Sequence, residues 1–191
     1  MAPVVGVLAL QGGFEAHARV LTGLGAVARE VRVPADLEGL DGLIIPGGES
    51  TVMTLGIERE GLAEPLRDLA RAGTPVLGTC AGMIMLDRGH LGLMDIATER
   101  NAFGRQVRSF EAEVPIEGLD GDPLHAVFIR APWIAEAGED VEILGEVDGR
   151  PVAARQGNLL TVAFHPELTG DRRVHELFLE TIRTRAADAA R

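Results

Sequence analysis

The sequence predicts an α/β protein in which helices cover both faces of a largely parallel sheet. Through the first half of the 191-residue chain, short apolar runs alternate with segments of helical spacing. Parallel strands need long crossover connections, which are usually helices, so this alternation is typical of a parallel sheet. Hydrophobic residues make up 46% of the chain, enough to fill the core of one domain of this length. We therefore expect a single domain over residues 1–191.

Four strands are expected in the first half, each a short apolar run that ends at glycine, proline or a polar residue. They cover residues 4–10, 28–33, 42–45 and 76–79. Helices are expected between these strands. Residues at helical spacing are Phe14, His17, Leu21 and Leu24 in the first helix and Leu62, Leu66 and Leu69 in a later one. Another helix is expected to begin near Thr51.

The second half contains shorter strand candidates, at 109–116, 126–129, 141–147 and 158–164. Asp148-Gly149 is a two-residue turn signal, and it predicts a hairpin between Glu146-Val147 and Pro151-Val152. A C-terminal helix follows, which Asp171 can cap. Its apolar face carries Val174, Leu177, Phe178 and Ile182.

Composition argues against several classes of function. The net charge is −11 and the 18 Lys and Arg residues are scattered, which argues against a nucleic-acid partner. The single cysteine excludes an intrachain disulfide and fits the reducing cytoplasm. No apolar run reaches membrane-spanning length, and the first run is expected to be a strand rather than a signal peptide. No metal-binding spacing such as H-E-x-x-H occurs, so no metal, cofactor or membrane partner is expected.

The segment Gly78-Thr79-Cys80-Ala81-Gly82 contains the only cysteine of the chain. A buried strand is expected before it and a packed helix after it, which is the strand–turn–helix context of a nucleophile elbow. Such a turn lifts the nucleophile clear of the sheet. It also places the sulfur at a helix N-terminus, which favours the thiolate form. The alternative interpretation is a buried structural cysteine.

A nucleophilic cysteine needs a base, and the base needs an orienting partner. His165 follows an expected strand and precedes Pro166 and Glu167. In an extended backbone residues i and i+2 point the same way, so Glu167 can accept from one imidazole nitrogen while the other faces Cys80. Both Cys80 and His165 are expected at the carboxyl ends of strands, where sites form in open α/β sheets. The alternative is that His-Pro-Glu only ends a strand.

The remaining histidines are weaker candidates for a catalytic base. His17 sits among apolar helix positions, where it either packs in the core or faces solvent. His90 precedes Leu91-Gly92 in an expected turn. His125 and His175 have no nearby carboxylate of defined geometry in the sequence.

Acyl transfer also needs hydrogen-bond donors for an oxyanion. The amide of Ala81, directly after Cys80, is one expected donor. The loop at 46–50 offers the other, because Gly47 and Gly48 carry no side chains and can approach a ligand closely. Arg130 ends an expected strand, and an arginine can bind a carboxylate through two hydrogen bonds. The alternatives are an ordinary loop and a solvated arginine.

Together these residues resemble the class I (triad) glutamine amidotransferases, and most of all the glutaminase subunits of pyridoxal 5′-phosphate synthases. The resemblance covers essentially the whole chain. Its segments are Leu-Gln-Gly at 10–12, Pro-Gly-Gly-Glu-Ser-Thr at 46–51, Gly-Thr-Cys-Ala-Gly at 78–82, Glu-Arg-Asn-Ala-Phe-Gly-Arg-Gln at 99–106, Phe-Ile-Arg-Ala-Pro at 128–132 and Phe-His-Pro-Glu-Leu at 164–168. The segments at 46–51 and 99–106 are the ones that point to this particular group of subunits.

The resemblance implies a three-layer α/β/α sandwich around a mostly parallel mixed sheet, which is flavodoxin-like. It implies that Cys80 is the nucleophile, His165 the general base and acid, and Glu167 its orienting partner. The residues implied to contact L-glutamine are Gly48, Glu49, Ser50, Arg100, Ile129 and Arg130, with the oxyanion held by Gly47, Gly48 and Ala81.

The resemblance also implies a partner. Gln11 would lie near the site and help to couple its activity to a (β/α)₈-barrel synthase subunit. The two subunits would form a hetero-oligomer, in which ammonia released from glutamine passes to the synthase. Pyridoxal 5′-phosphate would then be made from a pentose phosphate, a triose phosphate and this ammonia.

Three other functions are compatible with the same residues. The chain could serve a different synthase, such as imidazole glycerol phosphate synthase, and only the identity of the partner separates that case. A cysteine hydrolase of related fold would act on another amide without a partner. A regulatory module with a vestigial site would be indifferent to the loss of Cys80.

Overall fold

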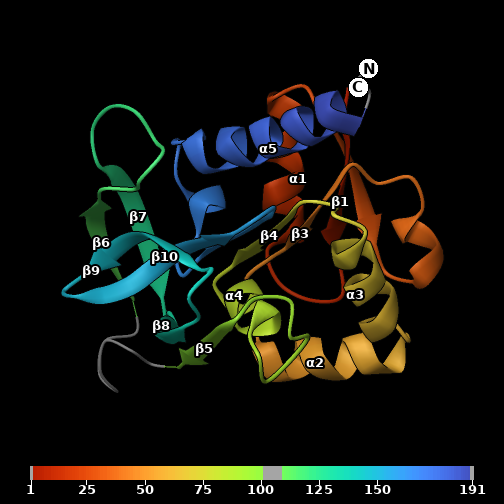
Figure 1. Ribbon diagram of the computed structural model, residues 1–191, viewed down its shortest axis with the longest axis horizontal. Coiled ribbons are helices and arrows are strands. Elements are labelled where there is room, and N and C mark those ends of the chain that lie inside the picture. Colours follow the sequence, from red (N-terminus) through yellow and green to blue (C-terminus); the bar gives the residue numbers. More distant parts are fainter. Residues whose placement is uncertain (1, 101–108, 190–191) are drawn as a thin grey trace.

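A seven-stranded mixed sheet forms the centre of the protein and confirms the predicted α/β class (Figure 1). The computed structural model describes residues 2–100 and 109–189. In spatial order the strands are β2 (Val27–Val31), β1 (Val4–Leu8), β3 (Gly42–Ile45), β4 (Val76–Thr79), β11 (Leu159–Val162), β10 (Arg150–Gln156) and β9 (Glu142–Val147). Neighbouring strands from β2 to β11 are parallel, and β10 is antiparallel to both of its neighbours. The sheet is therefore mostly parallel, as expected.

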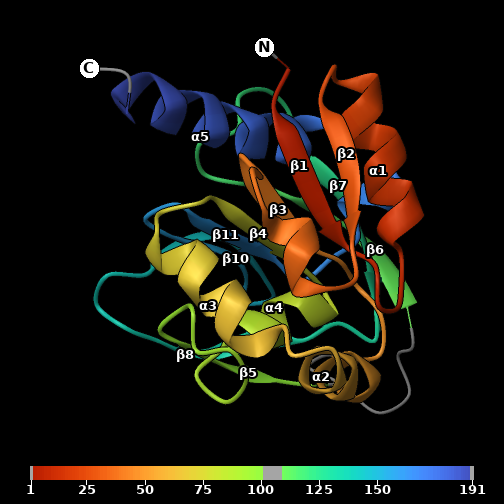
Figure 2. The same ribbon diagram turned by 90° about the vertical axis from the view of Figure 1, so that its right-hand side faces the viewer.

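Helices cover both faces of this sheet, which gives the three layers (Figures 1 and 2). One face carries α1 (Phe14–Gly23) and α5 (Arg173–Ala189), and the other carries α2 (Ser50–Arg59), α3 (Ala63–Arg71) and α4 (Ala81–Leu86). Two short 3-10 helices, η1 (Pro34–Leu37) and η2 (Pro166–Leu168), lie in loops. No helix in residues 2–100 and 109–189 is long and apolar enough to cross a membrane.

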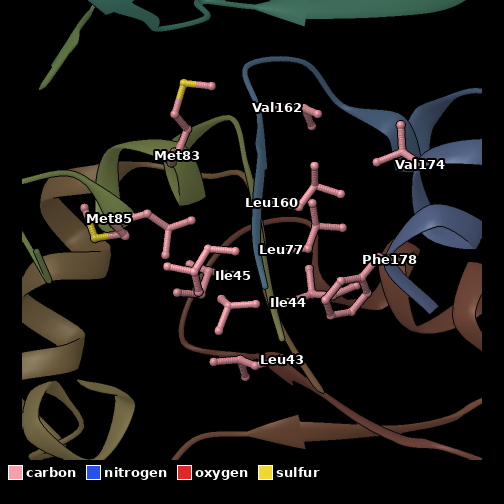
Figure 3. Close-up of a cluster of buried hydrophobic side chains, with 14 of the residues drawn as sticks. Leu43, Ile44, Ile45, Leu77, Met83, Met85, Leu160, Val162, Val174 and Phe178 are labelled. Atoms are coloured by element: carbon pink, nitrogen blue, oxygen red, sulfur yellow. The ribbon is translucent and has the colours of Figure 1, made fainter. Parts of the chain in front are cut away.

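The core is divided by the sheet because successive strand residues point to opposite faces. Ile44 and Leu77 lie on the side of Phe178 from α5, whereas Ile45 lies on the side of Met83 and Met85 from α4 (Figure 3). All six are at most 1% exposed. This two-sided burial is the reason that these strands are continuous apolar runs rather than alternating ones.

Local sequence signals located most elements to within a few residues. The strand expected at 4–10 ends at Leu8, and the helix expected near Thr51 begins at Ser50. Asp148 and Gly149 both have positive φ, 51° and 72°, as a type I′ hairpin turn requires, and they join β9 to β10.

Two small antiparallel sheets complete the fold, and the sequence only partly predicts them. They pair β5 (Ile96–Glu99) with β8 (Trp133–Ala137), and β6 (Ser109–Val114) with β7 (Leu124–Ile129). Neither β5 nor β8 was expected. Both are short and carry polar residues, and their pairing joins segments far apart in the chain, so no local pattern predicts it.

The sheet order also determines where a ligand can bind. From β1 the chain crosses to β2 on one side, whereas from β3 it crosses to β4 on the other. Loops that leave β1 and β3 therefore diverge, and this switch point opens a crevice at the carboxyl edge of the sheet. The ends of β4 and β11 lie next along the same edge.

Candidate active site

Cys80 lies between the end of β4 and the start of α4, in a sharp turn with φ 50° and ψ −108°. This unfavourable backbone conformation is typical of a nucleophile elbow. The flanking glycines are required by close packing. A Cβ at Gly82 would lie 1.9 Å from the Ile45 carbonyl oxygen, and a Cβ at Gly78 would lie 2.7 Å from the Gly82 carbonyl oxygen. The tight turn therefore depends on both glycines of the G-x-C-x-G segment.

His165 follows β11, the strand that pairs with β4, and its imidazole points to the same edge as Cys80. Its Nδ1 lies 2.8 Å from Glu167 Oε1. The expected pairing is present, but the expected extended backbone is wrong, because Pro166–Leu168 forms the 3-10 turn η2. The side chain of Glu167 is only 2% exposed and that of His165 is 12% exposed. The carboxylate is thus buried behind the imidazole, away from solvent.

The ionisation of these groups follows from their contacts. Burial by itself would lower the pKa of His165, but hydrogen bonds with Cys80 and Glu167 outweigh it and raise the pKa to about 10. Burial would raise the pKa of Glu167, but the hydrogen bond from His165 and the positive charge of that imidazole lower it instead. At neutral pH the imidazole therefore holds its proton and the carboxylate is charged.

A cavity of about 410 Å³ opens in front of Cys80 and His165. The sequence-predicted residues that line it are Gln11, Gly48, Glu49, Ser50, Cys80, Ala81, Arg100, Ile129, Arg130 and His165. Two lining residues were not predicted as site residues, Ile84 and Pro132. Ile84 lies four positions after Cys80, the N-cap of α4, so its place on the cavity wall could have been inferred from helical spacing.

Gly47 lies beside Cys80 and His165, although it does not line the cavity. A Cβ on Gly47 would lie 2.5 Å from His165 Cε1 and 3.2 Å from the Cys80 Cβ. Its carbonyl oxygen accepts from the Gly13 N–H at 3.2 Å. Since a trans peptide directs its C=O and N–H oppositely, the Gly48 N–H points away from Gly13. The glycine loop is therefore in contact with both members of the Cys–His pair.

The loops after β1 and β3 are tied together by Gln11. Its side-chain Oε1 accepts from the Glu49 N–H at 2.7 Å. The Glu49 carboxylate caps α2, accepting from the N–H groups of Thr51 at 3.2 Å and Val52 at 2.9 Å. These backbone donors lower the pKa of Glu49. Glu49 thus shapes the wall of the cavity as well as lining it.

Two arginines bring positive charge to the cavity. Arg130 follows β7 with a positive φ of 44°, and Arg100 follows β5. Ile129, beside Arg130, directs its carbonyl oxygen to within 3.8 Å of Cys80 Sγ. The rest of the polar segment singled out in the sequence, residues 101–106, lies outside the described residues.

One expectation about the other histidines is wrong. His125 does have carboxylate neighbours: its Nδ1 lies 2.7 Å from Glu113 and its Nε2 lies 2.9 Å from Glu111. Strand pairing sets His125 opposite Glu113, a relation that the sequence does not reveal. His125 is half-exposed and does not line the cavity. His17 and His175, by contrast, are fully buried.

The chain is similar along most of its length to several known proteins. A protein named pyridoxal 5′-phosphate synthase subunit PdxT from Frankia alni is 51% identical, over 95% of this chain and 96% of its own. The protein of the same name from Mycobacteroides abscessus is 52% identical, over 96% and 99%. A crystal structure described as a glutamine amidotransferase superposes with a TM-score of 0.87 at 46% identity, covering 93% of this chain and 98% of that one.

The family model that matches this chain is described as the SNO glutamine amidotransferase family. Its match covers residues 7–184, which include the loops after β1, β3, β4 and β11. The chain belongs to the SNO glutamine amidotransferase family.

Proposed function

We propose that this protein is the glutaminase subunit of a pyridoxal 5′-phosphate synthase, and that it hydrolyses L-glutamine at Cys80. The main support is the cavity, where an elbow cysteine and a protonated histidine stand among the residues expected to bind glutamine. A space of about 410 Å³ suits a single small ligand, and two arginines on its wall provide partners for an α-carboxylate. The similarity to proteins named PdxT supports the same function.

The reaction begins with the charge distribution of the Cys80–His165 pair. The high pKa of His165, about 10, keeps the imidazole protonated and able to act as an acid. The attacking group in the proposed reaction is the thiolate of Cys80. The sulfur adds to the side-chain amide carbon of glutamine. Negative charge develops on the amide oxygen, where the N–H groups of Gly48 and Ala81 are the proposed donors.

His165 then acts as the general acid. It gives its proton to the amide nitrogen, the C–N bond breaks, and ammonia leaves while a γ-glutamyl thioester stays on Cys80. The imidazole, now neutral, accepts a proton from water, and the resulting hydroxide attacks the thioester. Glutamate departs and the protonated His165 and the Cys80 thiolate are restored. Glu167 keeps the ring oriented through both halves of the cycle.

Ammonia released in this way must reach a second active site before water protonates it. We propose that the synthase subunit docks on this protein, in a hetero-oligomer, and receives the ammonia directly. Gln11, which joins the loops after β1 and β3 through Glu49, is positioned to transmit docking to the glycine loop. A cytoplasmic location is part of the proposal, and cell fractionation would test it.

The decisive experiment measures glutamate release from L-glutamine, with and without the synthase subunit of the same organism. Strong stimulation by that subunit is expected for the wild type, and complete loss is expected for Cys80→Ala. Circular dichroism and co-elution with the synthase subunit serve as controls that the variant folds and docks.

The alternatives predict different results. A Cys80-dependent rate that ignores this synthase subunit would point to another synthase. Turnover of Cys80→Ala near the wild-type rate would disprove the nucleophile assignment. An absence of glutamine turnover in both conditions would favour a cysteine hydrolase of another amide or a regulatory module.

A further inference from the structure

A second layer of polar side chains lies behind Glu167, on the side away from the cavity. It consists of His17 from α1, His175 from α5 and Thr79 from β4, and all three are 0% exposed. His17 Nε2 lies 3.4 Å from Glu167 Oε2 and 3.2 Å from Thr79 Oγ1. His17 Nδ1 lies 2.9 Å from His175 Nε2. The mechanism above assigns no role to these groups.

Burial of two histidines in a core is costly unless their nitrogens find partners. Burial lowers the pKa of His17 to about 4 and that of His175 to about 3, so both are neutral at physiological pH. A neutral imidazole has one donor and one acceptor. The pair therefore contributes hydrogen bonds, not charge, to the groups around it.

The contacts favour one arrangement of these protons. Glu167 Oε2 makes no regular hydrogen bond among the described residues, and neither does His175 Nδ1. If His175 donates from Nε2 to His17 Nδ1, then His17 donates from Nε2 toward Glu167 and Thr79. The ring nitrogen left without a partner is then His175 Nδ1, which carries no proton. The opposite arrangement would bury an unpaired N–H on His175 and turn a lone pair of His17 toward the carboxylate. The first arrangement leaves no imidazole N–H of the pair without a neighbouring acceptor.

We propose that His17 is a positioning residue for glutamine hydrolysis, holding the rear oxygen of Glu167 so that the front oxygen stays aligned with His165. The inference rests on the proposed function. His175 selects the tautomer of His17 in turn, by donating to its Nδ1. Glu167 Oε1 is then free to receive the His165 Nδ1–H, and His165 Nε2 is directed at Cys80. Donation from both sides therefore meets at Glu167, whose carboxylate faces the His17 N–H on the core side and accepts from the His165 N–H on the cavity side.

The first test is a set of variants assayed for glutamate release with saturating synthase subunit. For His17→Leu, kcat is expected to fall on the order of 10–100-fold. Losses of this size are typical when the hydrogen-bond partner that orients a metal-binding side chain is removed, and His17 orients Glu167 in the same way. KM for glutamine should change less than about twofold, because His17 does not line the cavity. His17→Gln, whose amide N–H can still reach Glu167, is expected to recover most of that loss.

His175→Leu is the comparison variant, because it removes an equally buried histidine that acts on Glu167 only through His17. Its loss in kcat is expected to be clearly smaller than that of His17→Leu. Equal losses in both variants, with no recovery in His17→Gln, would mean that the pair only fills the core, and would overturn the proposal. Thermal unfolding of each variant separates loss of fold from loss of rate.

The second test needs no turnover, so it separates this proposal from the proposed function. Nitrogen NMR shifts of ¹⁵N-histidine-labelled protein report which ring nitrogen carries the proton. His17 is expected to carry it on Nε2 and to have a bare Nδ1. In His17→Gln the alkaline titration of His165 should stay close to that of the wild type. A proton on His17 Nδ1 in the wild type would overturn the proposal even if glutamine hydrolysis is confirmed.

Discussion

Two histidines flank the same buried carboxylate, yet one is charged and the other is neutral at physiological pH. His165, on the cavity side of Glu167, has its pKa raised to about 10, whereas His17, on the core side, has its pKa lowered to about 4. Both lie within 3.4 Å of a carboxylate oxygen. His165 has a second hydrogen-bonding partner in Cys80, and His17 instead faces another neutral histidine. A carboxylate neighbour alone therefore does not decide the charge of a histidine.

The difference shows how the site divides its tasks. The cavity side stores a proton that the leaving group needs, so there a charged imidazole is useful. On the core side a charge would have to be buried without water, and a neutral ring that only donates a hydrogen bond is less costly.

Replacing His165 should produce the largest effect. His165→Asn removes the acid that protonates ammonia and the base that activates water, so kcat for glutamine hydrolysis is expected to fall roughly 10³-fold or more. Loss at His17 is expected to be at least tenfold smaller, because His17 acts only through Glu167. Single-turnover assays with the synthase subunit present would measure both. A loss of tenfold or less at His165 would point to another base.

Two glycines extend the comparison, because Gly47 contacts the catalytic pair whereas Gly82 packs against the backbone of β3. Gly47→Ala would place a Cβ 2.5 Å from His165 Cε1, so the ring must move. A displacement of about 1 Å can cost on the order of 10² in rate, and we expect a loss of that size with little change in unfolding temperature.

Gly82→Ala is the counterpart within the core. Its Cβ would lie 1.9 Å from the Ile45 carbonyl oxygen, where backbone must shift. Overpacking of this kind costs about 1–3 kcal/mol, so the free energy of unfolding should fall together with activity. Urea unfolding and glutamate release measured on both variants would test the contrast, and equal destabilisation by the two substitutions would contradict it.

The smallest effect is a change in the free energy of unfolding with pH. Its sign differs between the histidine on the cavity side of Glu167 and the two histidines on the core side. In the folded state the pKa of His17 is about 4 and that of His175 is about 3, whereas both have the ordinary value of 6.5 in the unfolded chain. Below pH 6.5 the unfolded chain therefore binds protons that the folded protein does not. Stability from these groups is present above pH 6.5 and is lost as the pH falls. His165, with a folded pKa of about 10, contributes stability below pH 6.5 that is lost as the pH rises toward 10.

These three groups together predict greatest stability near pH 6.5, their ordinary pKa. Urea unfolding between pH 5 and pH 9 measures it. The double variant His17→Leu/His175→Leu should flatten the acid side of the profile, and His165→Asn should flatten the alkaline side. If His165→Asn flattened the acid side instead, the assignment of charges would be reversed.

Much of the architecture could be predicted from local patterns. Apolar runs at 42–45 and 76–79 match β3 and β4 residue for residue, because strands buried on both faces have no polar positions to blur their limits. The elbow at Cys80 was evident because a strand, a turn with two glycines and a helix follow one another directly. By contrast, β5 and β8 pair across more than thirty positions and carry no such pattern.

The site was predicted in part from residues that are neighbours in the sequence and in part from the resemblance to a known family. His165 and Glu167 are two positions apart, so their pairing was expected, although the turn between them is 3-10 rather than extended. The burial of His17 was left open, since a histidine among apolar helix residues fits both surface and core. Its contact with Glu167 joins α1 to the loop after β11, and periodicity within α1 says nothing about that loop.

The sequence alone determined the class of fold, the turn that presents Cys80 and the identity of the residues that could act with it, because each of these depends on neighbours within a few positions. Only the tertiary structure decided that His165 is charged at neutral pH while His17 and His175 are neutral. A pKa depends on burial and on partners at hydrogen-bond distance, and those are set by the order of strands β3, β4 and β11 and by the packing of α1 against α5. The strand order places His165 between Cys80 and Glu167, and the packing of α1 and α5 encloses His17 behind them.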